Sequence, residues 1–286
     1  MAADFAPLVA ADVDAAAEVV SAALPPPVGG SETPEGRLER QRGRFAGALT
    51  SDPGGLWIAR EEGRAVGVAL ALRSDGLWVL GLLAVAPRAQ SGGIGRGLLE
   101  RALAYGDDCR GALIASSEDP RALRLYATAG FDLHPGVAAD GRLTRAALPA
   151  GLDATVAQAD PGDVERTVAI DRAIRGGARP AHLATLLTVP DTHLFIAGDR
   201  GYAIGRQGRL ITLAATDEAT AQALLWRVLA ETPAGVEAVV ERIGDGQQWA
   251  VDVVVRAGLR LRLDGPLFTR GELGPLRPFL PSGGYL

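Results

Sequence analysis

The stretch that most constrains the fold lies at residues 80–100, where an apolar run passes into a glycine-rich turn and then into a leucine-rich segment. The apolar run covers residues 77–85 and stops before Pro87, and glycines stand at 92, 93, 95 and 97. The leucine-rich segment that follows has helical spacing and continues to Ala104. This order predicts a strand, a tight turn and a helix whose first backbone N–H groups face one anion. The expected ligand is a phosphate or pyrophosphate.

Two common phosphate-binding loops do not fit this stretch. A Walker loop ends in Gly-Lys-Ser/Thr, whereas Gly95 is followed by Arg96 and Gly97. A dinucleotide fingerprint requires glycine or alanine three places after Gly95, where Leu98 stands. It also requires an acidic residue at the tip of a second strand near position 115, where Ala115 and Ser116 stand. The turn therefore indicates an anion site of another kind, with an ordinary strand-to-helix turn as the alternative.

Two motifs in order carry a resemblance to a known family. The spacing Gln90-x-x-Gly93-x-Gly95 after an apolar strand resembles the acetyl-CoA loop of the GNAT superfamily of N-acetyltransferases. Residues 112–116 are typical of a buried strand, and the helix that follows, residues 119–131, resembles the helix after the fifth strand of GNAT proteins. Two motifs together are more specific than either alone. We therefore expect a GNAT protein.

The second half of the sequence repeats the pattern of the first. A boundary is expected at residues 149–151, after a strand at residues 143–148, and residues 156–160 resemble residues 8–12. The chain is thus expected to be α+β, with two tandem GNAT folds, each a mixed and mostly antiparallel central sheet flanked by helices. The expected domains are residues 1–150, which bind acetyl-CoA, and residues 151–286, a GNAT-like copy that ends in an apolar tail after a proline-rich linker.

The two halves differ where chemistry is expected. When the halves are laid over each other, Gly93 falls on Ala219 and Gly95 on Ala221, and Gln90 falls on Thr216. Tyr126 likewise falls on Val254, which has no proton to give. We infer an active N-terminal copy and a degenerate C-terminal copy that kept the fold and lost the cofactor.

The resemblance implies direct transfer of the acetyl group of acetyl-CoA to an amine. Tyr126 would act as the acid that protonates the leaving thiolate, unless it is simply a core tyrosine. Three groups compete for the role of base: Glu118, His134 and the C-terminal carboxylate of Leu286, which would act as in the enhanced intracellular survival acetyltransferases. The cofactor contacts implied are Leu83, Ala84, Val85, Gln90, Ser91, Gly92, Gly93, Ile94, Gly95, Arg96, Arg121 and Leu125.

The amino-acid composition indicates which partners and which cellular compartment to expect. The 29 basic residues are all arginine, the 34 acidic residues give a net charge of -5, and no basic cluster suggests a nucleic-acid partner. The single cysteine, Cys109, favours a reducing cytoplasm and argues against a cysteine-based metal site. Neither an export signal nor a membrane span of about 18 apolar residues is expected.

Several alternatives stay open at this stage. The acceptor is a small-molecule amine or a peptide, and the sequence does not choose between them. A non-catalytic acyl-CoA-binding or sensing scaffold is the alternative to an enzyme. The oligomeric state and the length of the acyl chain are not readable from the sequence.

Overall fold

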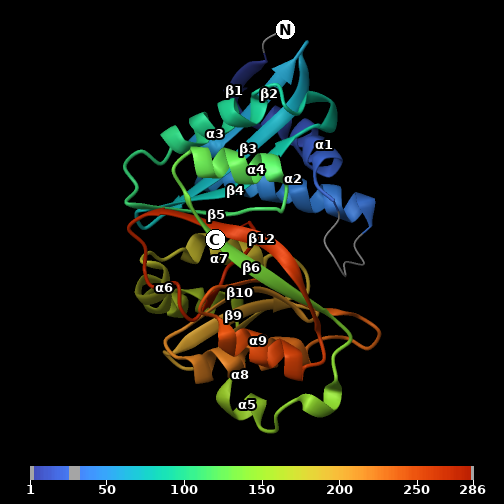
Figure 1. Cartoon of the computed structure of the whole chain (residues 1–286), viewed down its shortest axis with the longest axis vertical. Helices are drawn as coiled ribbons and strands as arrows, with labels where there is room; N and C mark the ends of the chain where they lie inside the picture. Colours follow the sequence, from blue (N-terminus) through green and yellow to red (C-terminus); the bar gives the residue numbers. More distant parts are fainter. Residues whose placement is uncertain (1–2, 26–32, 285–286) are drawn as a thin grey trace. The chain divides into compact units, whose positions relative to one another are not determined.

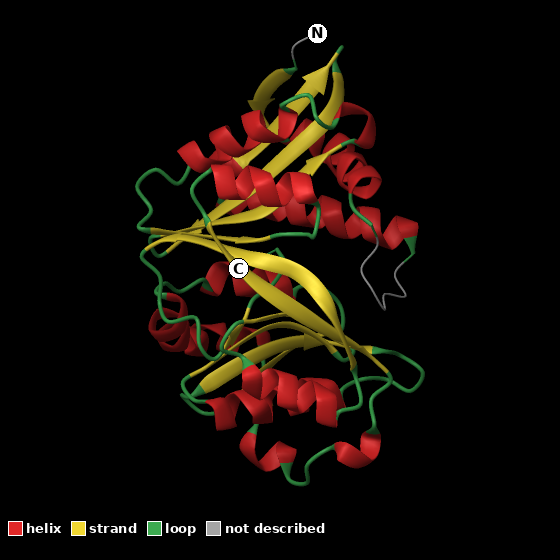
Figure 2. Cartoon of the chain, in the orientation of Figure 1, coloured by secondary structure: helices red, strands yellow, loops and turns green. Residues whose placement is uncertain are grey.

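The computed structural model describes residues 3–25 and 33–284 (Figures 1 and 2). The chain divides into two compact units, Met1–Cys109 and Arg110–Leu286, and each is described by itself. In the described ranges, no helix is both long enough and apolar enough to cross a membrane.

The described residues of unit 1 form an antiparallel sheet in the order β1-β2-β3-β4, with helices α1, α2 and α3. Seven consecutive residues of β3 are buried, because α1 and α3 both pack on this strand and both faces of the sheet are covered. The elements are β1 (Asp4–Pro7), α1 (Val13–Ala23), α2 (Pro34–Ser51), β2 (Leu56–Glu61), β3 (Arg64–Ser74), β4 (Leu77–Val85) and α3 (Ile94–Ala104).

Unit 2 contains a larger mixed sheet in the order β5-β12-β6-β11-β10-β9-β8-β7, and β13 pairs with β10. Its strands are β5 (Gly111–Ala115), β6 (Asp132–Gly141), β7 (Ala157–Ala159), β8 (Thr192–Ile196), β9 (Gly201–Arg206), β10 (Arg209–Ala215), β11 (Ala238–Gly244), β12 (Arg260–Gly271) and β13 (Phe279–Leu280). Its helices are α4 (Pro120–Thr128), α5 (Leu152–Thr155), α6 (Val168–Arg175), α7 (Pro180–Leu187), α8 (Glu218–Ala230) and α9 (Gln248–Arg256).

The order of the elements repeats along the chain. The series β1, α1, α2, β2, β3, β4, α3, β5, α4, β6 is followed by β7, α6, α7, β8, β9, β10, α8, β11, α9, β12. This repetition agrees with the α+β fold of two tandem copies that the sequence predicts. The division into residues 1–150 and 151–286 stays a prediction about the duplication, and the compact units divide the chain at a different place.

Two segments differ from the prediction. The strand expected at residues 143–148 is wrong: β6 runs over Asp132–Gly141, and residues 145–147 form a short 3-10 turn. The strand accommodates Pro135 because the register of its partner β12 shifts between Asp264 and Leu267, opposite this residue. The sequence also predicts no strand between Leu259 and the C-terminal tail, where the structure has β12, which lies between β5 and β6 (Figure 1, red beside green).

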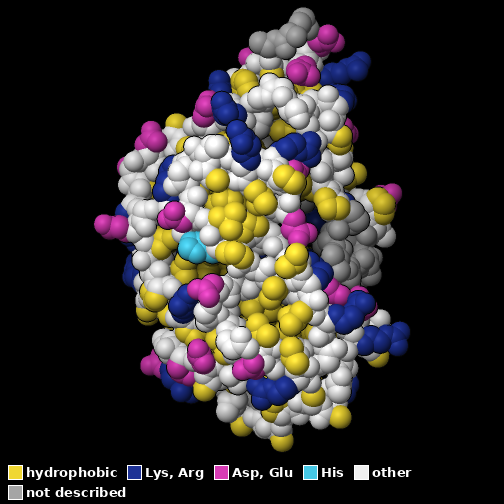
Figure 3. Space-filling view, in the orientation of Figure 1, with side chains coloured by type: hydrophobic (Ala, Val, Ile, Leu, Met, Phe, Trp, Pro, Cys, Tyr) yellow, Lys and Arg dark blue, Asp and Glu magenta, His cyan; other side chains and the backbone are white. Residues whose placement is uncertain are grey.

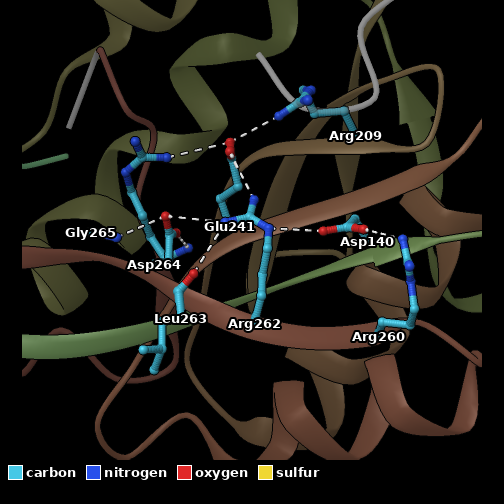
Figure 4. A network of polar contacts seen from close by, with 9 residues as sticks. Asp140, Arg209, Glu241, Arg260, Arg262, Leu263, Asp264 and Gly265 are labelled. Carbon is cyan, nitrogen blue, oxygen red and sulfur yellow. Dashed lines mark hydrogen bonds and ion pairs between the residues drawn. The ribbon is translucent and has the colours of Figure 1, made fainter. Parts of the chain in front are cut away.

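A network of charged side chains joins strands of unit 2 (Figure 4). Asp140 of β6 accepts hydrogen bonds from Arg262 Nε at 2.9 Å and from Arg260 Nη2 at 3.1 Å. Glu241 of β11 accepts one from Arg209 Nη1 of β10 at 2.9 Å. Arg262 Nη2 also lies 3.7 Å from Glu241 Oε1, so the network ties β6 of the first copy to β10, β11 and β12 of the second.

Candidate functional site

The turn between β4 and α3 is held by its own side chains and backbone. The Gln90 amide Nε2 donates to the carbonyl oxygen of Val85 at 2.9 Å, which fastens the turn to the end of β4. Ser91 and Gly93 both have left-handed backbone conformations, with φ of 69° and 85°. Ser91, Gly92 and Gly93 are exposed, whereas the next residue, Ile94, is 3% exposed and anchors the helix in the core.

The N-terminus of α3 is open. Gly93 is the N-cap residue, and no side chain caps this helix. The N–H of Gly97 donates to the carbonyl oxygen of Gly93, so the amides of Ile94, Gly95 and Arg96 come before the first helical hydrogen bond. A Cβ atom added at Gly93 would meet no atom within 4 Å. Positive helix-end amides beside open space are suited to an anion.

The predicted cofactor residues of β4 lead into this turn. Ala84 is buried, whereas Leu83 and Val85 are partly exposed. Val85 pairs with Gly67 of β3, and a Cβ atom at Gly67 would come within 2.9 Å of the side chains of Ile94 and Leu98. Glycine at this position lets α3 pack closely on the sheet beneath the turn.

Tyr126 lies in α4 of unit 2, and its side chain is only 5% exposed. Its ring meets the ring of Phe268 edge-on, with centroids 5.5 Å apart. Burial, and then the negative charge of Asp119, raise the pKa of the Tyr126 phenol above its usual range. The phenol therefore keeps its proton at neutral pH and is available as an acid rather than as a base. Leu125, beside it in the helix, is half-buried.

Asp119 caps α4 and also holds Arg121. Its carboxylate accepts from the Arg121 backbone N–H at 2.9 Å, and from Arg121 Nε at 3.0 Å and Nη2 at 2.6 Å. The hydrogen bonds from the Arg121 guanidinium lower the pKa of Asp119. A phosphate contact by Arg121, as predicted, would have to compete with this pair. The Asp-Pro sequence at the start of the helix is the signal that identifies this cap.

The three candidate bases lie in different places. Glu118 is exposed in the turn before α4. His134 lies in β6, with Nε2 at 2.8 Å from Thr269 Oγ1. Leu286 lies outside the described residues.

The structure thus brings the predicted residues into two groups. Leu83 to Arg96 form a continuous strand end, turn and helix start in unit 1. Glu118, Arg121, Leu125 and Tyr126 lie together around the start and inner face of α4 in unit 2.

The corresponding helix of the second copy is closed. Only residues 216 and 217 connect β10 to α8, against residues 86–93 between β4 and α3. The Asp217 carboxylate caps α8 by accepting from the Thr220 N–H and from Thr220 Oγ1, both at 2.8 Å. The helix end that would face a pyrophosphate therefore carries a negative charge of its own. Asp217 was not predicted as a cap, although an aspartate just before a helix is a typical capping signal.

The counterpart of Tyr126 in the second copy is also changed. Val254 lies in α9 and is completely buried. It contributes packing and no polar hydrogen.

Comparisons with known proteins point to one family. The sequence profile of the Acetyltransferase (GNAT) family matches residues 18–131. No curated protein matches the chain. Among solved structures, a candidate acetyltransferase from Pyrococcus horikoshii has a TM-score of 0.77 at 16% identity, with 99% of this chain and 94% of that chain covered.

Two further structures extend the comparison. A GCN5-related N-acetyltransferase from Sphaerobacter thermophilus has a TM-score of 0.58 at 18% identity, covering 94% of this chain and 95% of that one. A tandem GNAT protein from the clavulanic acid biosynthesis pathway has a TM-score of 0.57 at 15% identity, covering 94% and 98%. At such identities the similarity concerns the fold. The chain therefore carries an acetyltransferase domain of the GNAT family, within a fold that it shares along its length with a tandem GNAT protein.

Proposed function

We propose that the protein is an N-acetyltransferase that transfers the acetyl group of acetyl-CoA directly to an amine, using its N-terminal copy. The observation that carries the proposal is the uncapped start of α3 at Gly93, which the turn after β4 joins to the strand end at residues 83–85. This arrangement fits a pyrophosphate and an extended pantetheine chain. Membership in a family of acetyltransferases supports the same reaction.

Each group of residues has a role in this proposal. The backbone amides of residues 90–96 would hold the pyrophosphate, and the backbone of residues 83–85 would pair with pantetheine. The N–H of Val85 or a neighbour would polarise the thioester carbonyl, and an oxyanion held in this way lowers the barrier to acyl transfer. Tyr126 would give its proton to the departing thiolate, while Glu118, His134 or the Leu286 carboxylate would remove the proton of the amine.

The acceptor is proposed to be a small-molecule amine or a peptide. On the face shown in Figure 3, arginine side chains and acidic side chains are interspersed, which does not favour a nucleic-acid surface there. The cytoplasm, expected from the single cysteine, remains part of this proposal.

A non-catalytic acyl-CoA-binding scaffold is the second candidate. It is favoured by the exposure of both Glu118 and His134, since a catalytic base is usually held by its surroundings. Tyr126, buried and protonated in the motif helix, favours the enzyme.

The first experiment is calorimetric titration of acetyl-CoA into the wild type and two matched variants. Gly93→Val adds a side chain at the N-cap of α3, where the pyrophosphate is proposed to bind, whereas Ala219→Val makes the corresponding change at an exposed position of α8. We expect one site per chain, lost in Gly93→Val and kept in Ala219→Val. Because φ at Gly93 disfavours a side chain, circular dichroism must show that this variant is folded.

Two results would contradict the proposal: no binding to the wild type, or binding that survives Gly93→Val. Release of free CoA thiol with a panel of amines then separates the enzyme from the scaffold. The scaffold binds acetyl-CoA but releases no thiol.

A further inference from the structure

The sheet of the second copy opens between two strands. β10 and β11 are parallel neighbours, but they are paired only near their beginnings, where Arg209 lies opposite Val239. Further along, the edge of β10 pairs with β13: Leu213 lies opposite Leu280 and Ala214 opposite Phe279, antiparallel. β13 also packs against β11. The C-terminal segment therefore fills the place where the two strands separate.

This place has a counterpart in the first copy. By order of elements β10 corresponds to β4, so the end of β10, residues 213–215, corresponds to residues 83–85. Those are the residues whose backbone we expect to pair with pantetheine. An extended peptide offers the same kind of N–H and C=O groups as the amides of pantetheine. The N–H of Ala215 indeed donates to the carbonyl oxygen of Pro278 at 3.2 Å.

Gln247 holds the C-terminal segment from the helix side. This residue, only 4% exposed, is the N-cap of α9 and corresponds to Asp119 of the first copy. Its Oε1 accepts from the Phe279 N–H at 3.2 Å and from Trp249 Nε1 at 2.8 Å. Its Nε2 donates to the carbonyl oxygen of Leu276 at 2.9 Å. One side chain thus satisfies two backbone groups of the segment.

A buried cluster holds the segment from the sheet side. Thr212 Oγ1 donates to the carbonyl oxygen of Leu280 at 3.0 Å and accepts from Arg179 Nη2 at 3.0 Å. The fully buried guanidinium of Arg179 lies 5.7 Å from the centre of the Phe279 ring, and its charge is paired with Asp171, Nε to Oδ2, at 3.2 Å. Phe279 and Leu280 are 2% and 0% exposed. The second copy therefore contacts both the backbone of the C-terminal segment and its two apolar side chains, Phe279 and Leu280.

We propose that the second copy is a peptide-binding domain whose ligand is the chain's own segment 276–280, seated where an active copy takes pantetheine. Binding by addition of a strand to an open sheet edge is a general mode of peptide recognition. The Asp217 carboxylate at the start of α8 repels a pyrophosphate, so this site favours an extended peptide without negative charge over CoA. The proposal rests on the tandem fold and not on acetyl transfer, so either can fail without the other.

The test converts the segment into a separate ligand. A protease site is inserted at Glu272, which is exposed, and the folded full-length protein is cut there. We expect the released fragment, residues 273–286, to stay bound during gel filtration at micromolar protein and to exchange with a fluorescent synthetic peptide of the same sequence. Leu280→Asp should weaken retention at least about 100-fold, because it places a charge in a buried apolar site. Gln247→Leu should weaken it about 10-fold, since it removes hydrogen bonds to two backbone groups of the segment.

The matched control is Gln158→Leu, at an exposed side chain of β7 that bonds His193, and it should leave retention unchanged. Loss of the fragment on cutting, whether or not the remainder stays folded, would overturn the proposal. So would retention that Leu280→Asp and Gln247→Leu do not affect.

Hydrogen exchange of the uncut protein gives a second measurement that needs no insertion. We expect slow exchange over residues 276–282 in the wild type. In Gln247→Leu, exchange should become at least about 10-fold faster in this segment and at residues 213–215, while α8 keeps its protection. Equal protection of the segment in the wild type and in Gln247→Leu would contradict the proposal.

Discussion

Single residues decide what each copy can do. In the first copy Gly93 leaves the start of α3 open, and in the second Asp217 closes the start of α8 with a carboxylate. Likewise, a buried tyrosine in α4 becomes a buried valine in α9. The two copies share the order of their elements. They differ in whether a side chain caps the helix start and in whether the following helix carries a phenol.

Replacing Tyr126 with phenylalanine tests the proposed acid. We expect kcat to fall about 100-fold or more, because the phenol proton no longer assists the leaving thiolate. The dissociation constant of acetyl-CoA should change little, since the ring and its contact with Phe268 remain. The measurement is thiol release in the steady state, together with calorimetric binding. Tyr105→Phe, at a half-buried tyrosine of unit 1, is the matched control and should retain full activity.

The dependence of the rate on pH gives a second, independent test of Tyr126 as the acid. Because burial raises the pKa of Tyr126, the phenol stays protonated up to at least about pH 10, the usual pKa of tyrosine. The rate should therefore rise with pH as the acceptor amine loses its proton, with no descending limb below pH ~10 due to this residue. A descending limb near pH 8 that disappears in Tyr126→Phe would contradict the role as acid.

At the scale of elements, the two helix starts differ in how they are stabilised. The side chain of Asp217 caps α8, whereas no side chain caps α3. Asp217→Ala should lower the free energy of unfolding by about 1 kcal/mol, because it removes the acceptor for the Thr220 N–H. Glu218→Ala, the exposed neighbour in the first turn, should cost less. Chemical denaturation of both variants measures the difference, and equal losses would show that the cap contributes nothing specific.

An element could be predicted from the sequence where the residues that determine it are neighbours along the chain. The strand, turn and helix at residues 77–104 were predictable because apolar spacing, proline and glycine are all local. β6 was not predictable, because Pro135 and Gly136 are turn residues, and the register shift of β12 that accommodates them is more than 120 residues away. β12 was missed because its burial depends on partners distant in sequence. The site that holds the C-terminal segment beside Gln247 was missed because it depends on β13, a strand of only two residues.

At the scale of the whole molecule, strands from the first half of the sequence pair with strands from the second half. β12 comes from the second half of the chain, yet it pairs with β5 over Gly111–Ala115 and with β6 over much of its length. β6 in turn pairs with β11. Cutting the chain at residue 150 would leave β5 without β12, and β6 without β12 or β11.

A fragment of residues 1–150 expressed alone should therefore fail to fold into an acetyl-CoA-binding unit. Unpaired strand edges promote association with other chains, so we expect the fragment to be insoluble or aggregated. Co-expression with residues 151–286 should restore solubility and acetyl-CoA binding, because β11 and β12 then complete the sheet. Gel filtration and calorimetry of the two preparations make the comparison. A monomeric fragment 1–150 that melts cooperatively and binds acetyl-CoA would show that the pairing with β12 is dispensable, and that the duplicated half is a domain by itself.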